Sequence, residues 1–214
     1  GNINVDVNLD YTGGTGKLTL EASNQVEIKE GVTIRTGSGG LHIDATKGLI
    51  GLGDISLNNA GLLFIDQNEN SIFSGNISGN GGIKKDGLGG LTFINAHEYQ
   101  GSTNIIGGQL TFDTNSGLNS ASDVIIASKA TLNARKSLTV RSIEGQGTYW
   151  IDGDDVDLTI NTPSEISKDF EGVIKSTYSN SSVIKEGPGT QTFSGNNTYS
   201  GPTLVNAGTL RIAN

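Results

Sequence analysis

Short runs in which apolar and polar residues alternate occur along the whole chain and predict β-strands. Clear examples are residues 3–9, 26–28, 32–34, 138–140 and 158–160, where every second residue is Ile, Val or Leu. Because successive side chains of a strand point to opposite faces, the apolar set is expected to point inward and the polar set outward. No stretch keeps a 3.6-residue apolar period over three turns, so we expect no substantial helix.

A period of about 21 residues organises the N-terminal half. Similar segments begin at Gly40, Gly61 and Gly81, and the run 17–20 precedes them at nearly the same interval. A period of this length fits one coil of a parallel β-helix, in which each coil carries about three short strands. The sequence therefore predicts an all-β fold, a β-solenoid of roughly ten coils, about 50 Å long at about 4.8 Å per coil. We treat residues 1–214 as a single such segment.

A longer repeat is also present, because a shift of 100 residues aligns 83–112 with 183–212 without a gap. The weaker likeness of the preceding residues extends the two repeats to 73–112 and 170–212. Identical offsets predict that equivalent residues take equivalent inward positions and coil registers. The shared residues proposed as the scaffold of the repeat are Gly87, Phe93, Tyr99, Gly108 and Leu110 in the first copy and Gly187, Phe193, Tyr199, Gly208 and Leu210 in the second.

Composition agrees with short strands joined by tight turns. The chain has 34% hydrophobic residues, 32 Gly and no Met, a poor composition for helix packing. The lack of Cys excludes disulfides and thiolate chemistry, and a net charge of −8 disfavours nucleic acid and anionic membranes as partners. The longest apolar run is far shorter than a membrane span, so we expect no membrane insertion. Since the pattern is already under way at Gly1, we expect a segment of a longer repeat protein.

Two families resemble parts of this sequence. Residues 184–210, with Asn197-Thr198-Tyr199 near their centre, closely resemble the passenger-associated repeat of autotransporters. Residues 83–110 are a looser copy, in which His97-Glu98-Tyr99 replaces that central segment. Residues 16–65, and 17–34 most clearly, resemble the repeats of filamentous-haemagglutinin-type adhesins, which are exported by the two-partner route.

The resemblance implies a right-handed parallel β-helix that is exported through an outer-membrane β-barrel transporter. It further implies a protein secreted by, or displayed on, a Gram-negative bacterium, with no catalytic residues and no cofactor in these repeats. The expected function is that of a structural or adhesive module, a stalk or a binding surface. Its expected partner is a host-cell receptor, a glycan or a matrix component.

One acidic cluster is a candidate metal or catalytic site. The carboxylates of Asp152, Asp154, Asp155 and Asp157 could chelate Ca²⁺, but neither an EF-hand spacing nor tandem calcium repeats are present, and we interpret the segment as a solvated turn. The alternative function is a carbohydrate-active β-helix enzyme, either a polysaccharide lyase or a hydrolase, using the same carboxylates. Strand alternation allows at most one of the neighbouring aromatic residues 149 and 150 to line a carbohydrate groove.

The remaining candidates are weaker. His42 is expected to point outward, and neither it nor His97 has a second metal ligand at a suitable spacing. The Asn-X-Ser/Thr sequences at Asn76, Asn180 and Asn196 leave glycosylation open. If a loop protrudes to bind a partner, we expect it at residues 163–182 or 113–123.

Overall fold

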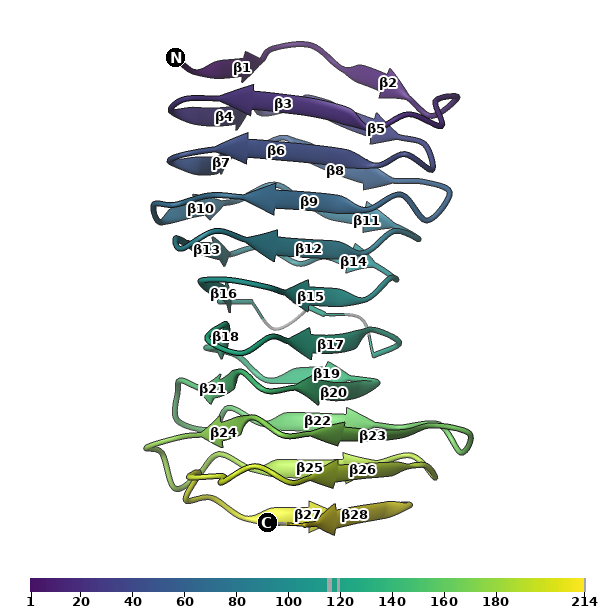
Figure 1. The fold of residues 1–214 in the computed structure, drawn as a ribbon, viewed down its shortest axis with the longest axis vertical. Helices are drawn as coiled ribbons and strands as arrows, with labels where there is room; N and C mark the ends of the chain where they lie inside the picture. The colour runs from purple at the N-terminus through teal and green to yellow at the C-terminus, as the bar shows by residue number, and fades with distance from the viewer. Residues whose placement is uncertain (115–116, 119, 214) are drawn as a thin grey trace.

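The computed structural model describes residues 1–114, 117–118 and 120–213, and the secondary structure there consists of strands without any helix. The described residues accordingly contain no helix able to cross a membrane. The strands wind into a parallel β-solenoid of about ten coils of roughly 21 residues, with the two ends of the chain at opposite ends of the rod (Figure 1). From the N-terminal end downward, the near strands run leftward and the far strands rightward in Figure 1, which is a right-handed coil. The predicted fold class is confirmed.

Each regular coil contributes one strand to each of three faces. The first face is a parallel sheet of nine described strands: β1 (Ile3–Val5), β4 (Gln25–Ile28), β7 (Gly48–Gly51), β10 (Ser71–Phe73), β13 (Gly90–Phe93), β16 (Gln109–Phe112), β18 (Thr131–Ala134), β21 (Thr148–Ile151) and β24 (Val173–Lys175).

The second face is divided into two described sheets, which occupy the same place in the chain order on either side of residues 113–122. The N-terminal sheet holds β2 (Leu9–Tyr11), β5 (Thr33–Thr36), β8 (Asp54–Leu57), β11 (Ile77–Gly79) and β14 (Glu98–Tyr99). The C-terminal sheet holds β19 (Leu138–Val140), β22 (Leu158–Asn161), β25 (Val183–Glu186) and β27 (Thr203–Val205).

The third face is a parallel sheet that runs the full height of the described rod. Its ten strands are β3 (Leu18–Ala22), β6 (Leu41–Ala45), β9 (Leu63–Asp66), β12 (Ile83–Asp86), β15 (Thr103–Ile105), β17 (Asp123–Ile126), β20 (Ser142–Gly145), β23 (Ser167–Phe170), β26 (Thr190–Phe193) and β28 (Thr209–Ile212).

Coil length varies around the predicted period. Leu41, Leu63 and Ile83 are aligned in register, so the period is as predicted, although the alignment lies one residue beyond that of the Gly-led segments, which would pair Leu41 with Leu62. On the first face, however, one coil takes 17 residues from Ala134 to Ile151, and the next takes 25 from Tyr149 to Ile174. The corners between strands absorb this difference, so the strands stay aligned while the loops vary.

Two expectations about strands and loops were wrong. Residues 3–9 do not form one strand, because the chain turns after β1 and leaves Val7 exposed before β2 begins. Residues 163–182 are not one long irregular loop, because they contain β23 and β24. Strand β23 lacks a visible apolar alternation, since Phe170 is its only fully buried side chain.

Inward side chains stack from coil to coil into one continuous core. On the first face Phe73, Phe93 and Phe112 are partners in adjacent strands, and all three are fully buried. Their rings pack edge to face, with centroids 6.4 Å apart for Phe73 and Phe93 and 5.5 Å apart for Phe93 and Phe112. This edge-to-face arrangement is the preferred geometry of aromatic pairs.

Two buried tyrosines differ in one hydrogen bond and give a matched test. The hydroxyl of Tyr99 lies 2.6 Å from Thr103 Oγ1, whereas the buried hydroxyl of Tyr149 has no hydrogen-bond partner. Because an unpaired buried hydroxyl keeps its desolvation cost, we expect Tyr149→Phe to raise the free energy of unfolding by about 1 kcal/mol and Tyr99→Phe to lower it by about 1 kcal/mol. Urea melts followed by circular dichroism measure both. Two changes of the same sign would contradict this assignment.

Candidate functional site

One column of outward side chains runs along the first face, and two separate hollows open beside it; we call the column with its hollows the groove. Strand pairing aligns these residues on successive coils from β10 to β24, parallel to the axis of the solenoid. The column consists of Ile72, Thr92, Thr111, Asn133, Trp150 and Lys175.

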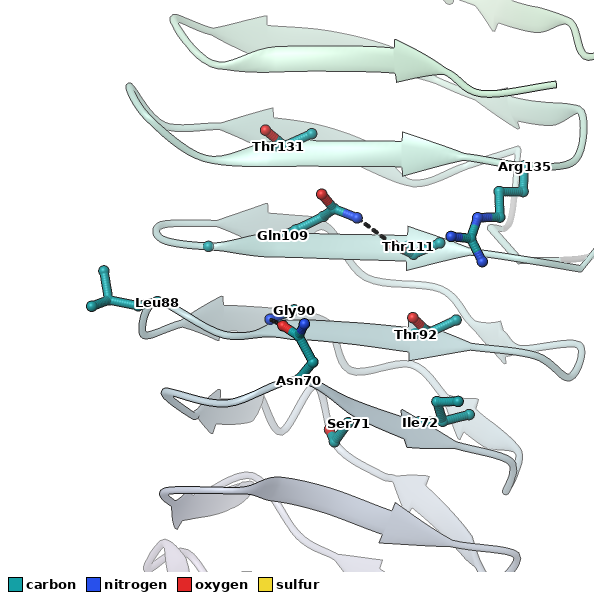
Figure 2. A pocket seen from close by; sticks show the side chains of 11 residues that line it. Asn70, Ser71, Ile72, Leu88, Gly90, Thr92, Gln109, Thr111, Thr131 and Arg135 are labelled. Atoms are coloured by element: carbon teal, nitrogen blue, oxygen red, sulfur yellow. Dashed lines mark hydrogen bonds between the residues drawn. The ribbon is translucent and has the colours of Figure 1, made fainter.

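The N-terminal part of this groove is a hollow of about 680 Å³ (Figure 2). Ile72, Thr92 and Thr111 line it. The other lining residues lie beside this column, in or next to strands β10, β13, β16 and β18. They are Asn70, Ser71, Leu88, Gly90, Gly108, Gln109, Thr131 and Arg135. Hydroxyl and amide groups therefore dominate the lining, with Leu88 and Ile72 as exposed apolar groups near one end.

Thr111 and Asn133 are the most buried residues of the column. Both point away from the core, yet they are only 2% and 1% exposed. Gln109 Nε2 donates to Thr111 Oγ1 at 2.9 Å, and Asn133 Nδ2 donates to Asp152 Oδ2 at 3.1 Å. The other amide atom of this asparagine, Asn133 Oδ1, is buried without a hydrogen-bond partner.

Arg135 lies beside the column at the end of β18. Its guanidinium lies at the level of β16 beside Thr111 (Figure 2). Arg135 Nη1 is 3.3 Å from Asp113 Oδ2, and Arg135 Nε is 3.5 Å from Asp152 Oδ2. Because two carboxylates surround one guanidinium, this part of the groove carries little positive potential.

Farther along the same column stands an aromatic residue, Trp150, beside the second hollow. As strand alternation predicted, the two neighbouring aromatic residues lie on opposite faces: Tyr149 is fully buried in the core and Trp150 points outward. Lys175 Nζ lies 4.4 Å from the centroid of the Trp150 ring, a cation–π distance. These two side chains border a further hollow of about 240 Å³, together with Ser176, Thr177 and Thr198.

The acidic cluster forms a turn between β21 and β22, and its carboxylates do not converge. Asp152 is directed to Arg135 and Asn133, while Asp157 Oδ1 accepts a hydrogen bond from Ser182 N at 2.7 Å. Asp154 and Asp155 are exposed. Residues 152–157 contain no basic residue, and the cation beside Asp152 is Arg135 of the preceding coil. Calcium binding at this turn stays a prediction.

A second set of carboxylates lies in register on the third face. Glu21, Asp44, Asp66 and Asp86 are partners on consecutive strands, so like charges lie directly opposite one another. Such pairs are destabilising. No group of three or more acidic or histidine side chains among the described residues is positioned to hold a metal ion.

The two histidines lie in different environments. His42 points outward as expected and stacks on Phe64, with ring centroids 4.5 Å apart. His97 is 3% exposed, lies edge-on to Phe93 at 4.3 Å, and accepts a hydrogen bond from Ile77 N at Nδ1. Burial lowers the pKa of His97 to about 3, so this imidazole is neutral in the folded chain.

The two repeats have the same local structure. Phe93 and Phe193 are fully buried, Leu110 is fully buried, and Leu210 packs against the core from the last coil. The Tyr199 hydroxyl lies 2.7 Å from Thr203 Oγ1, which matches the contact of Tyr99 in the first copy.

Shared glycines mark the tight corner of each repeat. Gly87 and Gly187 have φ values of +79° and +71°, and a Cβ would lie 2.1 Å from the carbonyl oxygen of Gln67 or 2.5 Å from that of Thr162. Only glycine fits both the left-handed conformation and this close approach. Gly108 and Gly208, which also have positive φ, form the second corner.

A shared lysine occupies a core position in each repeat. Lys85 lies between Ile65 and Ile105 in an inward column, and Lys185 lies between Ile160 and Val205. The ammonium of Lys85 donates to the carbonyl of Asp86, and that of Lys185 donates to Gly187 O at 2.8 Å. Desolvation lowers the pKa of Lys85 to about 8, although Asp66 and Asp86 oppose this shift, and desolvation also lowers the pKa of Lys185.

The repeats do not share a face of the solenoid. Phe93 lies in β13 on the first face, whereas Phe193 lies in β26 on the third. Phe93 and Phe193 both point inward, as expected. The expectation that the two copies occupy the same face of the solenoid was wrong. The coils differ in length, so 100 residues do not make a whole number of coils. From β13 the chain completes four coils to β24 and then continues through β25 on the second face to β26 on the third.

The other sequence candidates are placed as follows. Asn180 and Asn196 are exposed and Asn76 is half-buried, and their glycosylation stays open. The 113–123 loop contains residues 115, 116 and 119, which lie outside the described residues. A hollow of about 650 Å³ lies between residues 120–121 of this loop and residues 163–165 of the other proposed loop.

The fold and the repeats define the class of this chain as a parallel β-solenoid with passenger-type repeats. Residues 83–112 and 183–212 each match the model of the passenger-associated-transport-repeat, which confirms the repeat family expected from the sequence. The matches cover the residues that form the two glycine corners and the buried phenylalanines.

Two curated proteins are similar to the chain. It is 27% identical over 216 residues to the adhesin BmaC autotransporter of Brucella suis biovar 1, covering 97% of the chain and 5% of that protein. It is 36% identical over 120 residues to the uncharacterized lipoprotein YdeK of Escherichia coli, covering 52% of the chain and 9% of that protein. The chain thus spans less than a tenth of either relative. No solved structure matches it significantly.

Sequence reasoning missed the groove and the buried polar groups. Thr111 and Asn133 look like ordinary outward residues, because their burial depends on which side chains of the next coil lie beside them. The only signal was the pair of aromatic residues 149 and 150, of which alternation lets at most one face outward.

Proposed function

We propose that this chain is a rigid, adhesive segment of an autotransporter-type passenger, secreted by or displayed on a Gram-negative cell. The observation that carries the proposal is the occurrence of two passenger-associated-transport-repeats within one continuous solenoid core. The similarity to the BmaC adhesin along 97% of the chain supports the same function.

The geometry suits a spacer that also offers surface for contact. Parallel coils stabilise one another through nearest-neighbour packing, so the rod extends without a separate domain core. An outer-membrane β-barrel transporter is the proposed export partner, and a host-cell receptor, glycan or matrix component is the proposed target. The likeness of residues 16–65 to two-partner adhesin repeats remains a prediction about the origin of that half.

The enzyme alternative has less support. The carboxylates proposed for catalysis at residues 152–157 are directed to separate partners or to solvent. A glycosidase needs two carboxyl groups facing one bond, one of them kept protonated by its surroundings. We therefore propose binding without cleavage.

Surface display tests this function directly. We expect Escherichia coli cells that carry the chain ahead of an autotransporter β-barrel to be labelled by antibody while intact, and to adhere to cultured epithelial cells several-fold more than cells carrying the barrel alone. Labelling only after permeabilisation would contradict the export proposal. Labelling of intact cells without increased adhesion would contradict the proposed adhesive function and leave only the proposed function as a spacer.

A further inference from the structure

We propose that the groove on the first face binds an uncharged, extended oligosaccharide that runs along the solenoid axis. The inference rests on the proposed function, since a surface-displayed segment meets glycans, and it names the class of ligand. Four features of the groove carry it: its period, its hydrogen-bonding groups, its charge and its aromatic end.

The period of the groove matches a chain of sugars. Successive coils repeat at about 4.8 Å, which is close to the length of one pyranose in an extended chain. Register pairing places Gly90, Gln109 and Thr131 in one outward column beside the column of Thr92, Thr111 and Asn133. A ligand parallel to the axis therefore meets a new pair of outward positions with each sugar.

The groups on offer are those that recognise sugar hydroxyls. The lining presents the amides of Asn70 and Gln109 and the hydroxyls of Thr92 and Thr131. A sugar hydroxyl donates one hydrogen bond and accepts others, so it can pair with both the amide and the hydroxyl groups of this lining.

The charge of the groove favours a neutral ligand. Arg135 lies between Asp113 and Asp152, and the whole chain has a net charge of −8. A sulfated or uronic-acid polymer would therefore meet repulsion without a free cluster of cations. The two carboxylates nearest the column are both held by one guanidinium, which suits binding rather than acid–base catalysis.

The aromatic end supplies apolar contact. Trp150 stands in the same column as Thr111 and Asn133, two coils from Thr111. Indole rings pack against the C–H faces of sugars, whereas the surrounding hydroxyl and amide groups contact their edges. Ile72 offers a second exposed apolar surface at the opposite end of the column.

The single tryptophan of the chain makes the test direct. We expect titration of the 214-residue chain with neutral β-linked glucose and N-acetylglucosamine hexasaccharides to change the Trp150 fluorescence, with a dissociation constant between micromolar and low millimolar. The matching disaccharides should bind at least about tenfold more weakly, because they span fewer coils.

Variants locate the ligand on the first face. We expect Gln109→Ala to weaken hexasaccharide binding about five- to tenfold, measured by calorimetry, because it removes a donor at the centre of the groove. Trp150→Ala, also followed by calorimetry, should weaken it at least as much. Ser78→Ala, an outward change on the second face, is the matched control and should leave binding unchanged; circular dichroism melts establish that all three variants fold.

Three results would overturn the inference: no binding of the neutral hexasaccharides, binding that Gln109→Ala and Trp150→Ala leave unchanged, or preference for a sulfated heparin hexasaccharide. Adhesion of displayed chain without hexasaccharide binding would refute the groove and leave the proposed function intact. Hexasaccharide binding by the purified chain without surface display would do the reverse.

Discussion

Replacing Phe93 by alanine is expected to lower the free energy of unfolding by about 3–5 kcal/mol, the range for deleting a fully buried ring. Phe93 is in the middle of the first-face stack, in edge-to-face contact with Phe73 and Phe112 and with His97 on its other side. Its removal therefore leaves a cavity and also breaks aromatic pairs worth about 0.5–1.5 kcal/mol each. Urea melts of the wild type and variant, followed by far-ultraviolet circular dichroism, measure the change.

Phe193 provides the matched variant in the second repeat. It is equally buried and is aligned with Phe170 and Ile212, so Phe193→Ala should also cost about 3–5 kcal/mol. Phe93→Leu is the conservative control and should cost less than about 1.5 kcal/mol. A loss below about 1 kcal/mol for either alanine variant would mean that the ring is not packed in the core.

Acidification is expected to destabilise the fold through His97. Its pKa is about 3 when folded and near 6.5 when unfolded, so the unfolded chain binds more protons between these values. The contribution of His97 to the free energy of unfolding is therefore fully present above the unfolded pKa and is lost as the pH falls below it. The expected loss between pH 8 and pH 5 is about 2 kcal/mol from this group.

The variant His97→Gln isolates that contribution, because glutamine retains a hydrogen-bond acceptor and does not titrate. The difference between wild-type and variant unfolding free energies should shift by about 2 kcal/mol in favour of the variant between pH 8 and pH 5. A difference that stays constant over this range would show that His97 is already accessible to protons in the folded chain.

The sequence predicted the architecture well because a solenoid is built from local repetition. The 21-residue spacing of the Gly-led segments is the coil itself, and the alternation around Leu138 and Leu158 marks inward columns that the structure confirms. The buried Phe93 was predicted from the same alternation, and so was the placement of Tyr149 and Trp150 on opposite faces.

What could not be predicted depends on the relation between coils. Asn133 points outward and is nevertheless buried, and its hydrogen-bond partner Asp152 follows the strand of the next coil. Lys85 lies in an interior position that lysine rarely takes. His97 accepts its hydrogen bond from Ile77 N, 20 residues earlier on the preceding coil, a contact that only the folded chain brings together.

The rotation between the two repeats has a consequence for recognition. The glycine corners that the two copies share lie beside different faces of the rod. A partner that contacts such a corner in one copy would therefore meet its counterpart one face round the axis. Duplication in this chain therefore multiplied the directions in which a motif is presented and did not enlarge any one surface.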